Sequence, residues 1–248
     1  MTAKSFNWLF KIFRKIVKFL YPKITISGKE NLPEEPVILV ANHAQMHGPI
    51  CCEIYPPRES RTWCAAEMLT VREVPKYAYH DFWWVKPALS KPFYKFLSYI
   101  IAPISAIIFA NANTIPVWRN KRVISTFKQT VNTLIEGKDV IIFPEKNHLE
   151  NNILCTFQQN FVDVARLYYK RTGKVLSFVP MYIAPRLNKI CLGTAIQYDP
   201  ENDRDLERAR ICDYLTKQIT QTAEGLPRHR IVPYINLPKR LQPFNKEE

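Results

Sequence analysis

The run Pro36-Val37-Ile38-Leu39-Val40-Ala41-Asn42-His43 decides the fold class of this chain. Its first six residues are apolar without alternation, as expected of a strand that is covered on both faces of a sheet. Such strands are typical of parallel sheets, and open α/β sheets place their functional residues at the carboxyl ends of the strands. Asn42 and His43 stand at that end, so we expect them close to a site.

On either side of this run, short apolar segments alternate with segments of helical periodicity. Strands are predicted at residues 23–28, 61–66, 114–118, 140–143, 175–183 and 189–198, and helices at residues 121–136, 155–171 and 203–224. Alternating strands and helices are typical of an α/β sheet domain. We therefore predict an α/β fold with a mixed, largely parallel sheet flanked by helices, together with an N-terminal amphipathic membrane-surface helix.

The composition indicates a folded chain and argues against some nucleotide binders. Of 248 residues, 47% are hydrophobic, which is ample for a sizeable core. Only 6 residues are glycine, and neither G-x-G-x-x-G nor G-x-x-x-x-G-K-[ST] occurs, which argues against a Rossmann or P-loop phosphate site. The six cysteines show neither a C-x-x-C pair nor a zinc spacing, so we expect reduced thiols and no metal site.

Much of the net charge of +13 lies at the two ends of the chain. Residues 1–23 carry +6 and residues 228–248 carry +3, which leaves +4 for the remainder. This distribution indicates an anionic partner, either a membrane or a nucleic acid. No helix-turn-helix, zinc-finger or RNP-like pattern occurs, so we expect a membrane and no nucleic acid.

The N-terminal stretch FNWLFKIFRKIVKFL, residues 6–20, has the pattern of a basic amphipathic helix. Its apolar residues recur at helical spacing, and Lys11, Arg14, Lys15 and Lys18 fall on the opposite side. Such a helix lies in a membrane interface with its cations on anionic headgroups. The alternative is a helix packed on its own domain with a solvated basic face. The basic residues, with no cleavage site after them, argue against a secretory signal.

A second apolar run, FLSYIIAPISAIIFA at residues 96–110, carries no charge and contains Pro103. It is shorter than the ~20 residues that cross a bilayer. We predict a buried or interfacial helical segment, and hence monotopic or peripheral attachment to the cytoplasmic face of a membrane. The predicted organisation is a membrane-associating helix at residues 1–22, an α/β domain at residues 23–225 and a basic, proline-containing tail at residues 226–248.

Three predicted strand ends carry residues that suit phosphate and proton chemistry. His43 follows the first, Arg119 follows residues 114–118, and Glu145 follows residues 140–143. Histidine is the side chain best matched to general-base work near neutral pH. Arginine offers a planar, permanently charged fork for a phosphate.

The order of these blocks resembles the glycerophospholipid acyltransferase family, in particular the lysophosphatidate acyltransferases. The residues leading into His43 resemble the approach to the family's first motif, and Thr114–Arg119 is similar to the second, which ends in arginine. Ile142–Glu145 resembles the third, whose core is Phe-Pro-Glu, and Phe178–Met181 the fourth, a strand with Val-Pro. The resemblance covers about residues 22–200.

The resemblance implies transfer of a fatty acyl group from acyl-CoA or acyl-carrier protein to a hydroxyl of a lysophospholipid or glycerol phosphate-type acceptor. His43 would be the general base and Arg119 would hold the acceptor's phosphate. Glu145, with its neighbours Pro144 and Lys146, would help shape the acceptor site. The resemblance implies no metal and no prosthetic group, and its partners are a phospholipid surface and the acyl donor.

The sequence departs from the family at several positions. An aspartate normally stands five residues after the motif histidine, where this chain has Gly48. Lys146 stands in place of a glycine, Asn147-His148 follows it, and residues 157–161 lack a glycine often found there. In the family the missing aspartate orients the histidine, and loss of such a group costs a serine protease about 10⁴ in kcat.

Three interpretations of the first motif remain open. In the first, His43 is the base and takes another partner: Glu53, Glu67, His47 or a backbone carbonyl. In the second, His47 does the work or shares it. In the third, the chain keeps the fold and lipid pocket but has lost transfer activity. A metal pair of His43 and His47 is disfavoured, because the sequence offers no obvious third ligand.

Overall fold

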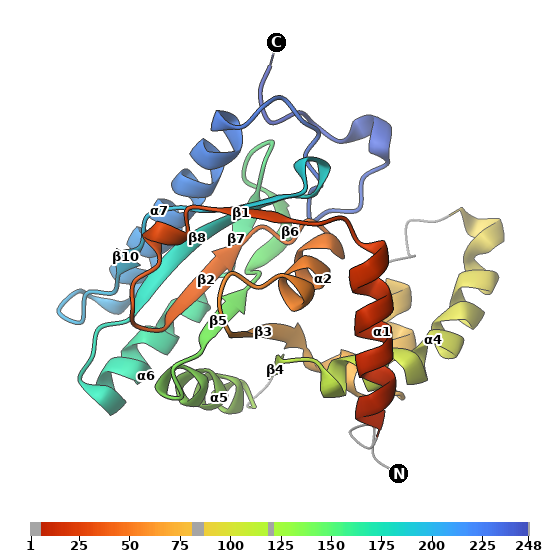
Figure 1. The fold of residues 1–248 in the computed structure, drawn as a ribbon, viewed down its shortest axis with the longest axis horizontal. Helices are drawn as coiled ribbons and strands as arrows, with labels where there is room; N and C mark the ends of the chain where they lie inside the picture. Colours follow the sequence, from red (N-terminus) through yellow and green to blue (C-terminus); the bar gives the residue numbers. More distant parts are fainter. Residues whose placement is uncertain (1–5, 81–86, 119–121, 248) are drawn as a thin grey trace. The chain divides into compact units, whose positions relative to one another are not determined.

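The computed structural model describes residues 6–80, 87–118 and 122–247, and the chain forms two compact units (Figure 1). Unit 1 consists of Met1–Pro22 and Trp63–Thr126, and unit 2 of Lys23–Thr62 and Phe127–Glu248. The two units thus alternate along the sequence, and the second segment of unit 1 lies between the two segments of unit 2. All six cysteines are free thiols.

Unit 2 is built on a mixed, largely parallel sheet, which confirms the predicted fold class. In spatial order the strands are β1 (Thr25–Ser27), β9 (Lys189–Leu192), β8 (Ser177–Ala184), β2 (Val37–Ala41), β5 (Asp139–Ile142) and β3 (Ser60–Ala65), with β10 (Ile196–Gln197) also paired to β8. The pairs β1–β9, β8–β2, β2–β5 and β5–β3 are parallel, and β8 pairs antiparallel with β9 and β10.

The apolar run that decides the fold class is strand β2, between β5 and β8 (Figure 1). Every residue of these three strands is buried. Because β2 is covered on both faces, apolar side chains are favoured at each of its positions, and no polar alternation appears.

The helices of unit 2 are α2 (His47–Ile54), α6 (Asp163–Thr172) and α7 (Arg204–Gly225), and α5 (Val123–Ile135) continues into this unit from unit 1. Helix α7 packs along β8. Gly173 ends α6 in the left-handed conformation with φ 70°, which glycine adopts without a steric penalty.

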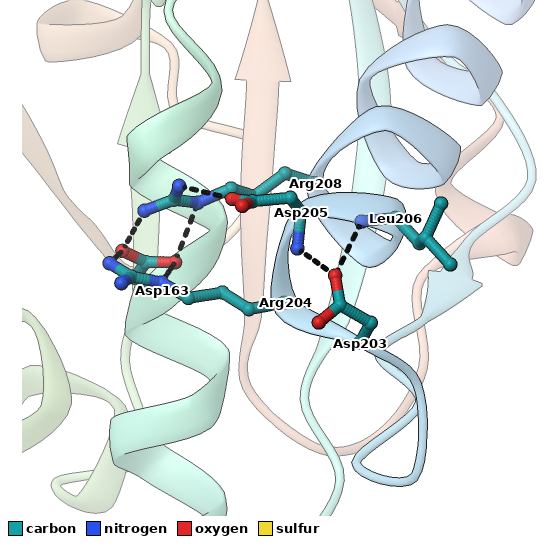
Figure 2. A network of polar contacts seen from close by, with 6 residues as sticks. All are labelled: Asp163, Asp203, Arg204, Asp205, Leu206 and Arg208. Carbon is teal, nitrogen blue, oxygen red and sulfur yellow. Dashed lines mark hydrogen bonds and ion pairs between the residues drawn. The ribbon is translucent and has the colours of Figure 1, made fainter.

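A charged cluster joins the first turns of α6 and α7 (Figure 2). Asp163 accepts hydrogen bonds from Arg204 and Arg208, while Asp203 caps α7 through the backbone N–H groups of Asp205 and Leu206. Burial opposes ionisation of Asp163, but the two arginines outweigh it and lower the pKa of its carboxyl. The cluster fixes the register of the two helices.

The helix predicted at residues 155–171 is wrong over its first four residues, and Gln159–Val162 forms a 3₁₀ helix that leads into α6. Cys155–Phe157 forms strand β7, which pairs antiparallel with β6 (Glu145–Leu149), and α6 begins only at Asp163. Asn151 accounts for the turn between these strands, since its Oδ1 accepts the N–H groups of Ile153 and Leu154, both at 2.8 Å. Such side-chain bonds favour a turn over a helix.

The segment predicted as a tail, residues 226–248, lies in unit 2 and carries buried side chains. Ile231 and Val232 are buried, and Arg230 forms an isolated antiparallel bridge with Phe244. Asn245 donates to the carbonyl of Ala223 at 2.8 Å, which ties the segment to the end of α7. Its described part is therefore anchored to the domain.

Unit 1 contains α1 (Asn7–Leu20), α3 (Val74–Ala78), α4 (Lys91–Asn111) and β4 (Thr114–Val117), and both α1 and α3 contact α4. Helix α4 has 21 residues and includes Pro103, so it is longer than the segment predicted at residues 96–110. The stretch Ala88–Asn111 is long and apolar enough to cross a membrane by length and composition, and only 22% of its most apolar window is buried. The helix is therefore longer than predicted and largely exposed, which disfavours the buried alternative, while an interfacial position stays a prediction.

Each of these two long helices exposes a stripe of apolar side chains. On α1 the exposed apolar residues are Trp8, Ile12, Ile16, Val17, Phe19 and Leu20, and on α4 they are Phe93, Phe96, Tyr99, Ile100 and Ile104. The most exposed is Phe19, at 88%. Phe10 of α1 is buried, so this helix has both a packed side and an exposed apolar side.

Candidate active site

The carboxyl ends of β2, β5 and β8 bring the candidate residues of unit 2 together. Val40 of β2 is in register with Ile142 of β5 and with Pro180 of β8. The next residues of β2 and β5 lead to His43 and Glu145 respectively. Two predicted site residues that lie far apart in sequence thus meet at one edge of the sheet.

Asn42 locks the end of β2 onto β8. Its side-chain nitrogen donates to the carbonyl of Ile183 at 3.0 Å, and its side-chain oxygen accepts the N–H of Ile183 at 2.7 Å. The buried amide therefore continues the pairing of the two strands while the backbone of β2 turns away. The position from which His43 leaves the sheet is fixed in this way.

A tight turn follows, from His43 to Gly48. Ala44 and Gln45 both adopt left-handed backbone conformations, with φ of 47° and 53°. This conformation is uncommon for residues other than glycine and is found where the surrounding structure enforces it, often at functional sites. The turn is closed by the N–H of Gly48, which donates to the carbonyl of His43 at 3.2 Å.

This turn fixes the imidazole of His43. Its Nδ1 lies 2.6 Å from the backbone carbonyl oxygen of Gln45. A carbonyl only accepts hydrogen bonds, so Nδ1 carries the proton, and in the neutral ring Nε2 is left with the basic lone pair. The half-buried ring also contacts Phe143 and Tyr234, with centroids 5.0 and 5.2 Å away.

Glu145 holds the backbone on both sides of the site. One carboxylate oxygen accepts the N–H of His43 at 2.5 Å, and the other accepts the N–H of Cys155 at 2.8 Å. Burial raises the pKa of Glu145 to about 7, although these two backbone hydrogen bonds lower it. Glu145 acts on the position of His43 through the main chain, a contact that the sequence did not predict.

The close approach of the chain explains why glycine stands at position 48. A Cβ atom there would lie 2.3 Å from the carbonyl oxygen of His43 and 3.0 Å from a ring carbon of Phe143. An aspartate cannot occupy this position without a shift of the backbone. Among the partners considered for His43 in place of the aspartate, a backbone carbonyl, that of Gln45, lies within hydrogen-bond distance of its ring.

The other predicted site residues lie at different places. His47 begins α2, and both partial burial and the positive charge of Arg186 lower the pKa of its imidazole. Pro144 is buried, and its carbonyl accepts the N–H of Gln158, while Lys146 is exposed on β6. Arg119 lies outside the described residues. Within the described residues, no group of three or more His, Cys, Asp or Glu side chains is arranged to hold a metal.

Two contacts of the site come from residues that the sequence did not single out. Gln45 contributes through its backbone, which leaves no signature in the side chain. Tyr234 belongs to the segment predicted as a tail, where a lone aromatic residue among prolines carried no periodic signal.

The fold is similar to that of a known acyltransferase. No family model and no curated protein matches the sequence. The crystal structure of the 1-acyl-sn-glycerophosphate (LPA) acyltransferase PlsC from Thermotoga maritima matches with a TM-score of 0.51 and 12% sequence identity. The match covers 91% of this chain and 83% of that chain. At this identity the similarity establishes the fold, and the chemistry depends on the site itself.

Proposed function

We propose that this protein transfers a fatty acyl group from an acyl thioester, either acyl-CoA or acyl-carrier protein, to a hydroxyl of a lysophospholipid or glycerol phosphate-type acceptor. The observation that carries the proposal is the Nδ1 contact of His43 with the carbonyl of Gln45, which leaves Nε2 as a base. The fold that the chain shares with an LPA acyltransferase supports the reaction class.

The reaction needs a positioned base, because an alcohol is far too weak an acid to ionise at neutral pH. Nε2 of His43 removes the hydroxyl proton as the oxygen attacks the thioester carbonyl. The carbon–sulfur bond then breaks, and the proton passes to the departing thiolate, so that an ester and a free thiol are formed. The base is regenerated within each cycle, and the scheme uses neither a metal nor a prosthetic group.

The carbonyl of Gln45 takes over part of the role of the missing aspartate. In a serine protease, exchange of the aspartate for its amide lowers kcat by about 10⁴, largely because the histidine adopts the wrong tautomer. Here the carbonyl preserves the tautomer but carries no full charge to stabilise the imidazolium. We therefore expect a slow acyltransferase whose base is still correctly oriented.

Four residues are proposed to form the acceptor site. Arg119 is proposed to hold the acceptor's phosphate through its guanidinium fork. Glu145 is proposed to shape the acceptor site by holding the backbone that carries His43, Pro144 by holding Gln158, and Lys146 to attract the anionic acceptor.

The protein is proposed to act at the cytoplasmic face of a membrane, to which it is attached peripherally or monotopically. Unit 1 contains 13 Lys and Arg against three acidic residues, a net charge of +10, which leaves +3 of the chain's +13 for unit 2. The same unit carries the exposed apolar stripes of α1 and α4. Cations beside exposed apolar side chains favour an anionic lipid interface.

The test is transfer of a labelled acyl group by purified protein. Acyl-CoA and acyl-carrier protein are offered with a panel of lysophospholipids and glycerol phosphate, in vesicles that contain anionic lipid. We expect product with at least one pair, a loss of at least about 10³-fold in kcat for His43→Ala, and a small effect for His47→Ala. Absence of transfer with every pair would contradict the proposal, and loss confined to His47→Ala would move the base to His47.

A second candidate is a lipid-binding protein without transfer activity, which Gly48 favours because no carboxylate can stand at that position. The same preparation distinguishes the two. Binding of a lysophospholipid with no turnover, unchanged in His43→Ala, would support this candidate instead.

A further inference from the structure

A strongly basic hollow of about 580 Å³ lies in unit 2, beside the C-terminal segment. Its lining consists of Arg186, Leu187, Arg228, His229, Arg230, Lys239 and Arg240. Five of these residues are Lys or Arg, and no carboxylate occurs among the described residues that line it. Cations gathered without acids raise the local potential and attract an anion.

The floor of the hollow is firmly held. The hydroxyl of Tyr182 donates to Nε2 of His229 at 2.8 Å, because Nδ1 of the same ring donates to the carbonyl of Pro227, also at 2.8 Å. The backbone N–H of His229 donates to the side chain of Asn245 at 2.8 Å. Strand β8, the end of α7 and the C-terminal segment thus meet at His229. These contacts hold the lining of the hollow in place before any ligand binds.

Two of the arginines are held in place by an aromatic ring. The guanidinium carbons of Arg228 and Arg230 lie 3.8 and 4.5 Å from the ring centroid of Phe244. Arg230 also donates to the carbonyl of Gln242 at 3.0 Å. These contacts hold the two positive charges close together despite their repulsion. An anionic ligand could therefore interact with both arginines at little further cost in their side-chain entropy.

The hollow is connected to the candidate active site by short stretches of chain. Arg230 precedes Tyr234 by four residues, which reach at most about 14 Å, and the Tyr234 ring contacts the ring of His43. On the other side, the charge of Arg186 acts on His47. The lining of the hollow and His43 are therefore near enough for one ligand of moderate length to be proposed for both.

We propose that this hollow binds the phosphates of the coenzyme A part of the acyl donor. Coenzyme A carries a diphosphate and a separate 3′-phosphate at the end opposite its thioester, which suits a cluster of five cations. The volume of the hollow lies within the range of about 300–1,000 Å³ for small-molecule sites. The assignment of a donor rests on the proposed function, but the binding of coenzyme A is testable by itself.

The binding experiment uses the full chain and free coenzyme A in a calorimetric titration at physiological salt. The test variant is Arg186→Gln/Lys239→Gln/Arg240→Gln, which removes three exposed charges and keeps the backbone carbonyl of Lys239.

A second triple variant serves as the matched control for total charge. It is Lys29→Gln/Lys170→Gln/Lys217→Gln, which removes three exposed cations of unit 2 that do not line the hollow.

We expect the test variant to bind coenzyme A roughly ten- to a hundredfold more weakly than wild type, and the control variant to bind it within about threefold of wild type. 3′-Dephospho-coenzyme A should bind wild type more weakly than coenzyme A. Equal weakening in both variants would overturn the proposal, as would inorganic phosphate that binds as tightly as coenzyme A.

Two further arms separate this proposal from other outcomes. Vesicles of phosphatidylglycerol that bind wild type but not the test variant, with coenzyme A affinity unchanged, would assign the hollow to lipid headgroups and overturn the proposal. In the transfer assay, the KM for acyl-CoA should rise in the test variant, while the rate with a phosphate-free acyl-pantetheine thioester should not change. Tight, hollow-dependent binding of coenzyme A without any transfer would leave this proposal standing and contradict only the proposed function.

Discussion

At the scale of single residues, the turn from His43 to Gly48 determines what the site can do. Its left-handed residues, Ala44 and Gln45, bring a carbonyl oxygen to the His43 ring, and its glycine allows the backbone to close on itself. The orientation of the base is thus provided by main-chain atoms. Side-chain substitutions that leave the turn intact should therefore leave the tautomer of His43 unchanged.

Gly48→Ala should destabilise the protein by about 1–3 kcal/mol, because its Cβ would meet the His43 carbonyl at 2.3 Å. Urea unfolding measures the change. Gly225→Ala is the control, since nothing lies within 4 Å of the atom it adds, and its stability should equal or slightly exceed that of wild type. Gly48→Asp should likewise destabilise and should not raise the rate of acyl transfer; an aspartate variant that is as stable as wild type and faster would contradict this account.

Glu145 predicts a pH dependence of stability. Its pKa of about 7 lies above the ordinary value of 4.5. The folded state therefore favours the protonated acid. This contribution is fully present below about pH 4.5 and is lost as the pH rises through 7, up to about 3 kcal/mol in total.

The variant Glu145→Gln lacks this titration, so its stability should fall less than that of wild type between pH 5 and pH 8, as measured by urea unfolding at both values. Whatever the amide itself costs is the same at both pH values and cancels in the comparison. Glu201→Gln, at an exposed position, should follow wild type. A constant difference between wild type and Glu145→Gln at the two pH values would rule out titration of this buried carboxyl in this range.

The sequence indicated which residues meet at the site, but not how they touch. His43 and Glu145 were placed together because both follow apolar runs of parallel strands. That the carboxylate accepts the backbone N–H of His43 depends on the hairpin of β6 and β7, and the residues of β7 were predicted as the start of a helix. The role of Gln45 depends on two positive φ angles, which side-chain chemistry does not reveal for residues other than glycine.

At the scale of elements, buried strands were predicted well and the β6–β7 hairpin was not. The strand predicted at residues 36–41 matches β2 to within one residue. A continuous apolar run is favoured where both faces of a sheet are covered, as both faces of β2 are. The segment at residues 155–171 has apolar residues at helical spacing and at the alternating spacing of a strand. The hydrogen-bonded turn at Asn151 favours the strand at the start of this segment. Local side-chain to backbone bonds are strong enough to override weak periodicity.

Helix α1 predicts a specific loss of membrane binding. Phe19→Ala/Leu20→Ala removes two of its most exposed apolar side chains and should weaken binding to anionic vesicles roughly tenfold or more, measured by flotation. Leu206→Ala/Leu241→Ala, at exposed positions of unit 2, is the control and should float like wild type. Equal losses in both variants would show that α1 has no special role at the membrane.

At the scale of the whole molecule, the candidate active site and most of the net charge belong to different units. The described part of unit 2 carries the candidate active site and the basic hollow, and unit 1 carries +10 of the chain's +13 together with the exposed apolar stripes. Net charge alone indicates an anionic partner, and the division of the chain into units shows that most of this charge belongs to unit 1. Since the residues of unit 1 are separated by those of unit 2 in the sequence, only the fold reveals this concentration.

Hydrogen exchange measured with and without phosphatidylglycerol vesicles should therefore change in one unit. Backbone amides of α1 and α4 should exchange more slowly when vesicles are present, because lipid covers their exposed faces. Amides of α7 in unit 2 should exchange at the same rate in both conditions. Protection confined to α7, or spread evenly over both units, would contradict membrane contact through unit 1.

The glycine at position 48 also bears on how this chain can evolve. The aspartate of the glycerophospholipid acyltransferases differs from this glycine at one position of the sequence only. The backbone of the turn nevertheless excludes its side chain, since even a Cβ atom would meet the His43 carbonyl. An aspartate at this position would need the backbone of the turn to move as well. The carbonyl-oriented histidine is therefore separated from a carboxylate-oriented one by the course of the main chain and not by one side chain alone.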